Sequence, residues 1–352
     1  MNTIQQQAAQ AIRQMQADLA EAAVTRQYAL QPEVWLPYGE IGRQHSVRDE
    51  GYLLTYLCEA LAAGEPALFI EYLAWARVFF AGLKFREDML PMTLATTRQT
   101  LEQMLPAECK PAALEYLDMG LHSLVEAPAA LESFIEHDNP LAGLARRYLD
   151  SLLRGDRPSA SRMILDSAGS GTPIPDIYMH VFQPSQREIG RLWQTNQISV
   201  AQEHYCTAAT QMIMSQLYPY IFASERKGRR LVVACVGGEL HEIGARMVAD
   251  IFEMDGWDTY FLGANTPMES VLRTLAEREP DVLAVSATMT FHIDKVSRLI
   301  DALRQAGLDR RTRVLAGGYP FNIAPGLWKT VKADGFASDA RQALSVAESL
   351  IK

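Results

Sequence analysis

The sequence predicts an α/β domain at the carboxyl end of the chain and all-α structure before it. After residue 229, short apolar runs alternate with amphipathic helical segments. Before residue 223, helical periodicity is interrupted mainly at Gly and Pro. An alternation of strands and helices is typical of a parallel sheet that is covered by helices on both faces. We therefore expect three domains, over residues 1–138, 139–223 and 229–352.

The composition is that of a protein with well-packed cores, because 48% of the 352 residues are hydrophobic and 21% are charged. No uninterrupted apolar run of about 18 residues is present, and the first residues are polar. The sequence therefore predicts neither a membrane span nor a secretory signal. The four cysteines are scattered without metal-type pairing, which is typical of reduced thiols. We expect a cytoplasmic protein.

The negative charge is concentrated in the first domain. Residues 1–140 contain 19 Asp and Glu against 9 Lys and Arg, whereas the whole chain has a net charge of −9. Proteins that bind nucleic acid directly carry a basic footprint. The acidic first domain therefore argues against direct binding to nucleic acid.

Residues 1–138 are predicted to be almost wholly helical. The segment from Gln31 to Gly42 contains two prolines and two glycines and is expected to be irregular. An aromatic-rich stretch over residues 69–80 indicates a core helix, with a small-molecule pocket as the alternative. The expected helices after the irregular segment cover residues 46–63, 65–83, 86–105 and 111–126.

Residues 139–223 are predicted to form a second helical block. Short loops between helices of this length are typical of an up-down four-helix bundle. Pro184 lies inside the third helix and should kink or interrupt it. The expected helices cover residues 141–154, 159–168, 174–195 and 199–220.

The first predicted strand, at residues 230–236, is followed by a turn at Gly237 and Gly238 and then by His241. His241 is therefore expected at the carboxyl end of a parallel strand, where open α/β sheets bind ligands. The turn lacks the G-x-G-x-x-G order of a dinucleotide-binding loop. A capping or surface histidine is the alternative interpretation. Further strands are expected at residues 258–262, 282–287, 313–316 and 335–337.

Three short motifs follow one another along this last domain: Glu239-x-His241-x-x-Gly244, Ser286-x-Thr288 and Gly317-Gly318. The pattern resembles the cobalamin-binding (B12-binding) domain of methionine synthases, base-off mutases and related proteins. The signature of that family is Asp-x-His-x-x-Gly, then Ser-x-Leu or Ser-x-Thr, then Gly-Gly. The resemblance implies a Rossmann-like (flavodoxin-like) parallel sheet that binds cobalamin.

The resemblance implies that His241 binds cobalt as the lower axial ligand, in place of the cofactor's own base. Imidazole is a good ligand for cobalt, and a carboxylate behind it would fix its tautomer. Glu239 stands where the family has Asp, and Glu242 is a competing candidate for this carboxylate. The other residues implied to contact the cofactor are Ile243 and Gly244 beside the ligand, Ser286 and Thr288 along the nucleotide tail, Gly317 and Gly318 where the backbone approaches the tail, and Tyr319 as its cover.

The helical block carries a second resemblance. Trp193 is followed ten residues later by Glu203-His204, a Trp-x9-Glu-His pattern that resembles the helical cap of light-sensing, adenosylcobalamin-dependent transcriptional repressors. The resemblance implies that Trp193 lies against the adenosyl group, with Glu203 and His204 on the same side. A Trp193 in the bundle core and a solvated Glu203–His204 pair are the alternative. The chain differs from these repressors in having Gln194 directly after the tryptophan, and it lacks their basic winged domain.

These resemblances, over residues 141–352, predict a cobalamin-binding sensor or photoreceptor that is not itself a DNA-binding repressor. The expected cofactor is adenosylcobalamin, with methylcobalamin and hydroxocobalamin as alternatives. The amino-terminal domain would pass the signal to a protein partner or to an interface between copies of the chain. The alternative functions are a corrinoid carrier in a methyltransferase system and a cobalamin store or chaperone. A mutase subunit is disfavoured, because 352 residues leave no room for a substrate barrel.

Overall fold

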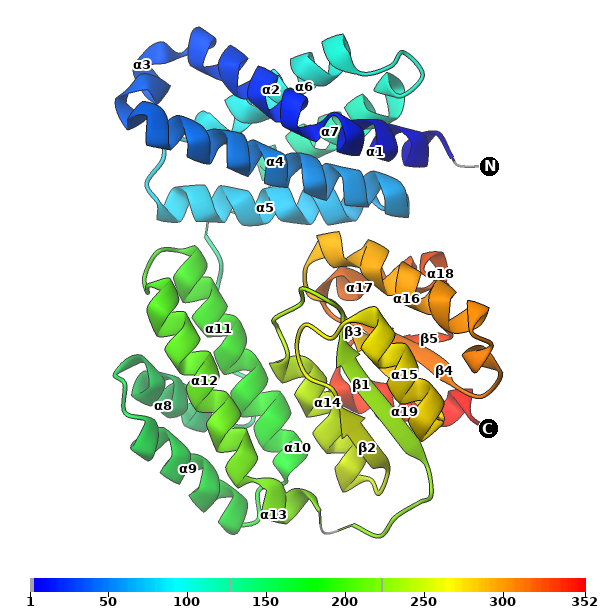
Figure 1. The fold of residues 1–352 in the computed structure, drawn as a ribbon. Helices are drawn as coiled ribbons and strands as arrows, with labels where there is room; N and C mark the ends of the chain where they lie inside the picture. The colour runs from blue at the N-terminus through cyan, green and yellow to red at the C-terminus, as the bar shows by residue number, and fades with distance from the viewer. Residues whose placement is uncertain (1–2, 127, 129, 223) are drawn as a thin grey trace. The chain divides into compact units, whose positions relative to one another are not determined.

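The computed structural model describes residues 3–126, 128, 130–222 and 224–352. The chain forms two compact units, Met1–Ala130 and Leu131–Lys352. The first unit is helical, and the second combines helices with one parallel sheet (Figure 1). This arrangement confirms the predicted fold class. Among the described residues, no helix combines the length and the apolar character that crossing a membrane requires.

The first unit is a bundle in which α4 packs against α1, α2 and α5. Its second layer is formed by α6 and α7, which pack against each other and against α2 and α5, respectively. The elements of this unit are α1 (Ile4–Gln14), α2 (Gln16–Leu30), α3 (Pro32–Trp35), η1 (Leu36–Tyr38), α4 (Gly39–Ala63), α5 (Pro66–Gly82), α6 (Met89–Met104) and α7 (Lys110–Glu126).

The segment is helical from Pro32 to Gly42, so the prediction of an irregular segment is wrong. Pro32 is the first residue of α3, Pro37 lies in the first turn of η1, and Gly39 is the first residue of α4. The first N–H groups of a helix have no partner within the helix, so a proline there removes no hydrogen bond. The two prolines therefore start helices at these positions and interrupt none.

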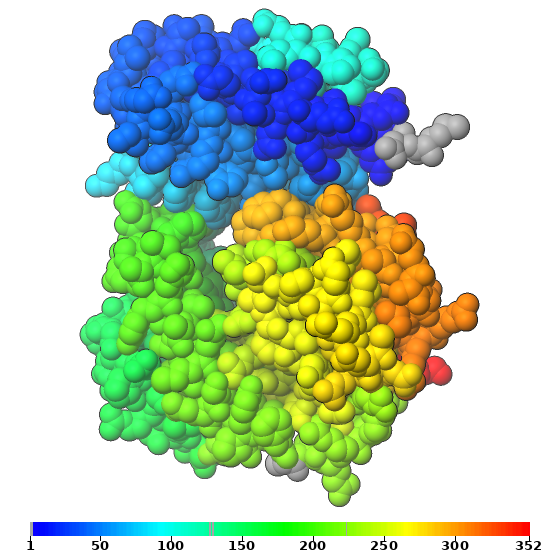
Figure 2. Space-filling model, in the orientation of Figure 1, coloured from blue at the N-terminus to red at the C-terminus, as the bar shows by residue number. Residues whose placement is uncertain are grey.

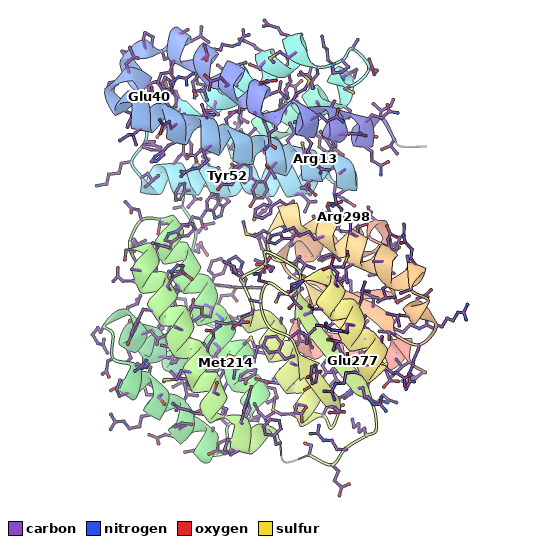
Figure 3. The ribbon with its side chains drawn as sticks, in the orientation of Figure 1. Arg13, Glu40, Tyr52, Met214, Glu277 and Arg298 are labelled. Atoms are coloured by element: carbon purple, nitrogen blue, oxygen red, sulfur yellow. The ribbon has the colours of Figure 1, made fainter. Side chains whose placement is uncertain are left out.

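The second unit begins with four helical rods, which form the predicted four-helix cap. The third rod is continuous over residues 174–194, and the buried side chains of Tyr148, Tyr178, Phe182 and Met214 fill the core between the rods (Figure 3 labels Met214). The elements of the cap are α8 (Ala142–Leu153), α9 (Arg157–Gly169), α10 (Ile174–Ile177), η2 (Tyr178–Phe182), α11 (Gln183–Gln194), α12 (Val200–Gln216) and α13 (Tyr218–Ile221).

Pro184 changes the pitch of the third rod but does not end it. The turn before it, η2, is a π-helix. Because proline has no N–H, a carbonyl about one turn earlier loses its helical donor. The His180 carbonyl accepts a hydrogen bond from Asn139 Nδ2 at 2.8 Å. The side chain of Asn139 thus satisfies a backbone group that the proline leaves without a partner.

The sheet contains parallel strands in the order β2-β1-β3-β4-β5, the doubly wound order of flavodoxin-like folds. Its register aligns Cys235 of β1, Ser286 of β3 and Gly317 of β4 in one row at the carboxyl ends of the strands. The loops that carry the three sequence motifs therefore leave the sheet at the same edge. The elements of this part are β1 (Arg230–Cys235), α14 (Ile243–Met254), β2 (Asp258–Phe261), α15 (Met268–Arg278), β3 (Val282–Ser286), η3 (Thr290–His292), α16 (Ile293–Gln305), η4 (Leu308–Arg310), β4 (Arg313–Gly317), α17 (Tyr319–Ile323), α18 (Leu327–Thr330), β5 (Gly335–Ala337) and α19 (Ala340–Leu350).

The cap packs against the face of the sheet that α14 and α19 cover, while α15 and α16 cover the opposite face (Figure 1). Met247 and Ile251 of α14 belong to the same hydrophobic core as the cap. Two buried polar side chains join the same surfaces, because Tyr178 Oη donates to Asp250 Oδ2 at 2.7 Å. The guanidinium of Arg246 also donates to the Gln211 carbonyl of α12 at 3.1 Å. These contacts fix one end of the cap to α14.

The buried carboxyl of Glu50 makes the stability of the first unit depend on pH. Glu50 is 3% exposed and accepts a hydrogen bond from Thr97 Oγ1 at 2.7 Å. Burial raises the pKa of Glu50 to about 7, although the hydrogen bond from Thr97 opposes the shift. The folded chain then holds this proton more tightly than the unfolded chain does. Protonated Glu50 therefore contributes to the free energy of unfolding below pH 4.5. This contribution is lost as the pH rises through about 7.

We predict that Glu50→Gln, which cannot ionise, is more stable than the native chain at pH 8 by about 2 kcal/mol. Near pH 5 the difference should be much smaller, because most of the native Glu50 is then protonated. Urea unfolding of the full chain at the two pH values measures both differences. The exposed Glu40→Gln on the same helix is the matched control. An effect of Glu50→Gln that is equal at pH 5 and pH 8 would contradict the prediction.

Candidate functional site

The turn after β1 buries one side chain of the first motif and exposes another. Glu239 is fully buried, whereas the side chain of His241 is 60% exposed. Glu239 Oε1 accepts hydrogen bonds from His241 Nδ1 at 2.6 Å and from His241 N at 3.0 Å. The carboxylate thus fixes the orientation of the imidazole. Because Nδ1 is engaged, Nε2 is the nitrogen that a ligand can reach.

The second oxygen of Glu239 joins the β1 loop to the loop after β3. Oε2 accepts from Thr288 N at 2.6 Å, from Met289 N at 3.1 Å and from His292 Nδ1 at 2.9 Å. His292 is 3% exposed and lies in the turn that precedes α16. All hydrogen-bonding capacity of the carboxylate is therefore satisfied inside the protein, as a buried charge requires.

These contacts determine the charge of both groups. Burial alone would favour the protonated carboxyl, but hydrogen bonds from His241, His292 and the backbone hold the pKa of Glu239 well below its usual range. The hydrogen bond to Glu239 raises the pKa of His241 although desolvation opposes this, and the negative charge of Glu203 adds to the increase. A metal that binds Nε2 must displace the proton that this environment favours.

Glu242, the competing carboxylate, has a different set of partners. Its Oε1 accepts from Gln211 Nε2 of α12 at 2.6 Å, and its Oε2 accepts from Ala264 N at 2.8 Å. Glu242 thus links the cap to the loop after β2, while Glu239 is the carboxylate that contacts His241. Ile243 and Gly244 follow as the first residues of α14. A Cβ at Gly244 would meet no heavy atom within 4 Å, so the space beside this turn is open.

The second motif lies beside the first. Ser286 is the last residue of β3 and pairs with Cys235 of β1, and the half-buried Thr288 donates its backbone N–H to Glu239. The hydroxyl contacts with a nucleotide tail that were predicted for Ser286 and Thr288 stay a prediction. The main-chain hydrogen bond from Thr288 is a further contact, which the sequence did not indicate.

The third motif follows β4, where Gly318 meets the loop after β3. Gly318 has a φ of 106°, and a Cβ there would overlap the carbonyl oxygen of Ala287. Its lack of a side chain therefore allows the two loops to approach each other. Gly317 is less constrained, because its Cβ would lie 3.5 Å from the nearest atom, the carbonyl oxygen of Ala337. Tyr319 begins α17 and is 48% exposed.

The three cap residues lie near the loop between α11 and α12. Trp193 is half-buried in the last turn of α11, Glu203 lies in the first turn of α12, and His204 follows it. The Glu203 carboxylate is 3.4 Å from His204 Nε2 and accepts from Thr207 Oγ1 at 3.0 Å. The negative charge of Glu203 lies near enough to the β1 loop to act on His241. Figure 2 shows a hollow between the cap helices and the loops of the α/β part.

Two residues of the site were not predicted from the sequence. His292 contacts Glu239, and Gln211 contacts Glu242. A signal for His292 is present in the first motif, where Glu239 replaces the aspartate of the resembling family. The extra methylene lets the carboxylate reach a deeper partner than an aspartate could. No comparable signal marks Gln211, which is an ordinary polar residue on a helix.

The arrangement fits a corrinoid on three observations. The exposed imidazole of His241 offers Nε2 while its Nδ1 is held by a carboxylate, the pattern that orients histidine ligands of metals. Open space adjoins Gly244 at the start of α14. A hollow separates the cap from the loops of the α/β part, and the negative charge of Glu203 in the cap acts on His241. Among the described residues, no group of three or more His, Cys, Asp or Glu could hold a bare metal ion.

Comparison with protein families gives two matches. A family model described as a B12 binding domain matches residues 229–345, and a second model with the same description matches residues 144–218. The first covers the sheet and its helices, and the second covers the cap. Neither reaches the first helical unit.

Curated relatives and a solved structure match part of this chain. Dimethylamine corrinoid protein 3 of Methanosarcina acetivorans is 28% identical over 36% of this chain and 59% of its own length. The chain thus spans about three fifths of that protein. Trimethylamine corrinoid protein 2 of the same organism is 21% identical over 58% of this chain and 94% of its own length. The monomethylamine corrinoid protein of Methanosarcina barkeri shares the fold, with a TM-score of 0.53 and 22% identity over 60% of this chain and 99% of that chain.

These relatives contradict the prediction of a light-sensing regulator. They are named as corrinoid proteins for methylamines, and signalling is absent from their names. The interpretation of Trp193, Glu203 and His204 as parts of a photoreceptor therefore fails. Contact between these three residues and a bound cofactor stays a prediction.

We predict that the pKa of His241 in the cofactor-free protein lies above its ordinary 6.5 and falls in Glu239→Gln. The neutral amide removes the negative charge that favours the imidazolium. The chemical shifts of the imidazole protons during an NMR titration measure both values. His204→Gln leaves this hydrogen bond intact and serves to assign the signals. A pKa of His241 that is the same in both proteins would show that Glu239 does not control its charge.

Proposed function

Because the chain belongs to the family of cobalamin-binding proteins that combine these two domains, we propose that it is a corrinoid carrier of a methyltransferase system. The observation that carries the proposal is the pairing of cap and sheet in this chain, together with a sequence match that covers 94% of a trimethylamine corrinoid protein. The substrate class follows from the same relatives: a small methylated compound, of which methylamines are the first to test. This function was the alternative to a sensor in the interpretation of the sequence.

In this proposal the chain binds, orients and shields the cofactor. His241 would bind cobalt through Nε2, and Glu239 would hold the imidazole in the required tautomer. Ser286, Thr288, Gly317 and Gly318 would line the nucleotide tail. The cap residues Trp193, Glu203 and His204 would cover the opposite face, and Ile243, Gly244 and Tyr319 would complete the contacts.

When bound, the corrinoid supplies a cobalt centre that can carry a methyl group from a donor to an acceptor. The proposal assigns the transfer steps to partner enzymes. We propose a methyl-carrying or hydroxo form as the working cofactor instead of adenosylcobalamin. Extraction and mass spectrometry of the corrinoid from protein purified in the dark identify the form.

The first helical unit is proposed to contact the partner enzymes or a second copy of the chain. Neither B12 binding domain model extends to residues 1–143, so this unit adds a surface outside both matched domains. It holds most of the acidic excess of the chain. A partner with a basic docking surface fits that charge, and its binding would weaken with salt.

We predict that the chain, loaded with hydroxocobalamin and reduced, becomes labelled in extract of its own organism when a methylated amine with an isotopic methyl group is added. The label should leave the protein when a thiol acceptor and its transferase are present. Gel filtration under red light followed by scintillation counting measures both steps. Label that never appears on loaded protein, in extract that methylates a free corrinoid, would reject the carrier function.

His241→Ala is predicted to weaken cobalamin binding by about tenfold or more and to change the absorption spectrum of the bound cofactor. The reason is the loss of the proposed axial nitrogen. His180→Ala, in the cap at a distance in the sequence from all three motifs, is the matched control and should bind as the native chain does. Equal affinity and equal spectra in native protein and His241→Ala would refute the assignment of the ligand.

A further inference from the structure

His292 is a buried histidine to which no part of the proposed function has assigned a role. It is 3% exposed and contacts the carboxylate that also holds His241. Its Nδ1 lies 2.9 Å from Glu239 Oε2, while His241 Nδ1 lies 2.6 Å from Oε1. Each oxygen of one carboxylate therefore receives one imidazole. Since the carboxylate is an acceptor only, both histidines donate their Nδ1–H to it.

The surroundings of His292 keep it in this tautomer. A Cβ at Gly238 would lie 3.3 Å from His292 Nε2 and 2.8 Å from Lys295 Nζ. The lysine ammonium and the far nitrogen of His292 thus occupy the same small space beside the glycine turn. Lys295 Nζ also donates to the Gly237 carbonyl at 2.6 Å. Nε2 of His292 thus lies beside a cation, whereas its Nδ1 faces the carboxylate.

Gly238 makes this arrangement possible. Its φ is 85°, a conformation that favours glycine, and a side chain there would collide with Lys295 and crowd His292. The glycine of the turn therefore serves the contacts of α16 and its preceding turn, in addition to reversing the chain. The first residues of α16 and the β1 loop form one packed group around Glu239.

We propose that His292 is a positioning residue for the axial ligand, acting on His241 through the shared carboxylate of Glu239. The inference rests on the proposed binding of cobalt by His241. By donating to Oε2, His292 holds the carboxylate in the plane that His241 needs. It also withdraws electron density from the carboxylate, which limits how strongly the carboxylate attracts the His241 proton and so sets how strong a donor His241 is.

The experiment uses the full chain and cob(II)inamide, a corrinoid that lacks the cofactor's own base. Any axial nitrogen seen in its electron paramagnetic resonance spectrum must then come from the protein. Affinity and nitrogen splitting are measured for native protein, His241→Ala, His292→Leu and His292→Asn. The asparagine amide offers an N–H close to the place of the imidazole Nδ1–H, whereas leucine offers none. Thr290→Val, buried in the same turn and not among the described hydrogen-bond donors to Glu239, is the matched control.

We expect His292→Leu to weaken cobinamide binding by about 10–100-fold and to alter the nitrogen splitting, as is typical when a group behind a metal ligand is lost. His292→Asn and Thr290→Val should stay close to the native chain. In a Glu239→Asp background the carboxylate no longer reaches His292, so His292→Leu should have little further effect. Circular dichroism checks the fold of each variant. If His292→Leu does not fold, the results for His292→Asn and Glu239→Asp test the role of His292.

The failures of the two proposals are distinguishable. A native spectrum without axial nitrogen, unchanged in His241→Ala, would refute the ligand assignment and with it the role of His292. A native axial nitrogen that is lost in His241→Ala but retained with native affinity in His292→Leu would overturn the role of His292 alone. The role of His292 would also be overturned if His292→Asn weakened cobinamide binding as much as His292→Leu does, because the N–H donor would then make no difference.

Discussion

The buried charge of Glu239 is the constraint on which the arrangement of the site depends. A carboxylate without solvent is costly unless every acceptor position is filled. Here the donors come from the β1 loop, from the loop after β3 and from the turn before α16. Those three segments must therefore keep fixed distances from one another. The hydrogen bond from His241 Nδ1 to this buried carboxylate orients the exposed imidazole. A side chain at the surface is thus held in one position.

Much of this arrangement could be predicted from the sequence because it follows from local rules. Strands of a parallel sheet end at one edge, so motifs placed after β1, β3 and β4 had to meet there. The glycine in the third motif was expected to allow a close approach, although the approaching group is the Ala287 carbonyl and a role toward the cofactor is still a prediction. The helical cap also followed from periodicity. The segment around Pro32 and Pro37 was mispredicted because proline starts helices as readily as it breaks them.

The rest depended on contacts between segments far apart in the chain. Glu239 and His292 are separated by 53 residues, and Gln211 and Glu242 by 31, so no local pattern reports either pair. The light-sensing interpretation failed for a related reason. Trp193 and Glu203-His204 describe the surface of a cap, and a cap of the same shape can serve more than one chemistry at the metal. The function depends on which molecules approach that surface, and the spacing of Trp193 and Glu203-His204 does not identify them.

The attachment of the cap to α14 has a mechanical consequence. Its polar contacts gather at Gln211 and Tyr178, while Glu203 lies near the far end of α12. The helix rises about 1.5 Å per residue, so Glu203 is about 12 Å from the contact at Gln211. A rotation of the cap about its contacts with α14 would therefore move Glu203 more than it moves Gln211. A tilt of about 10° would displace Glu203 by about 2 Å over that distance.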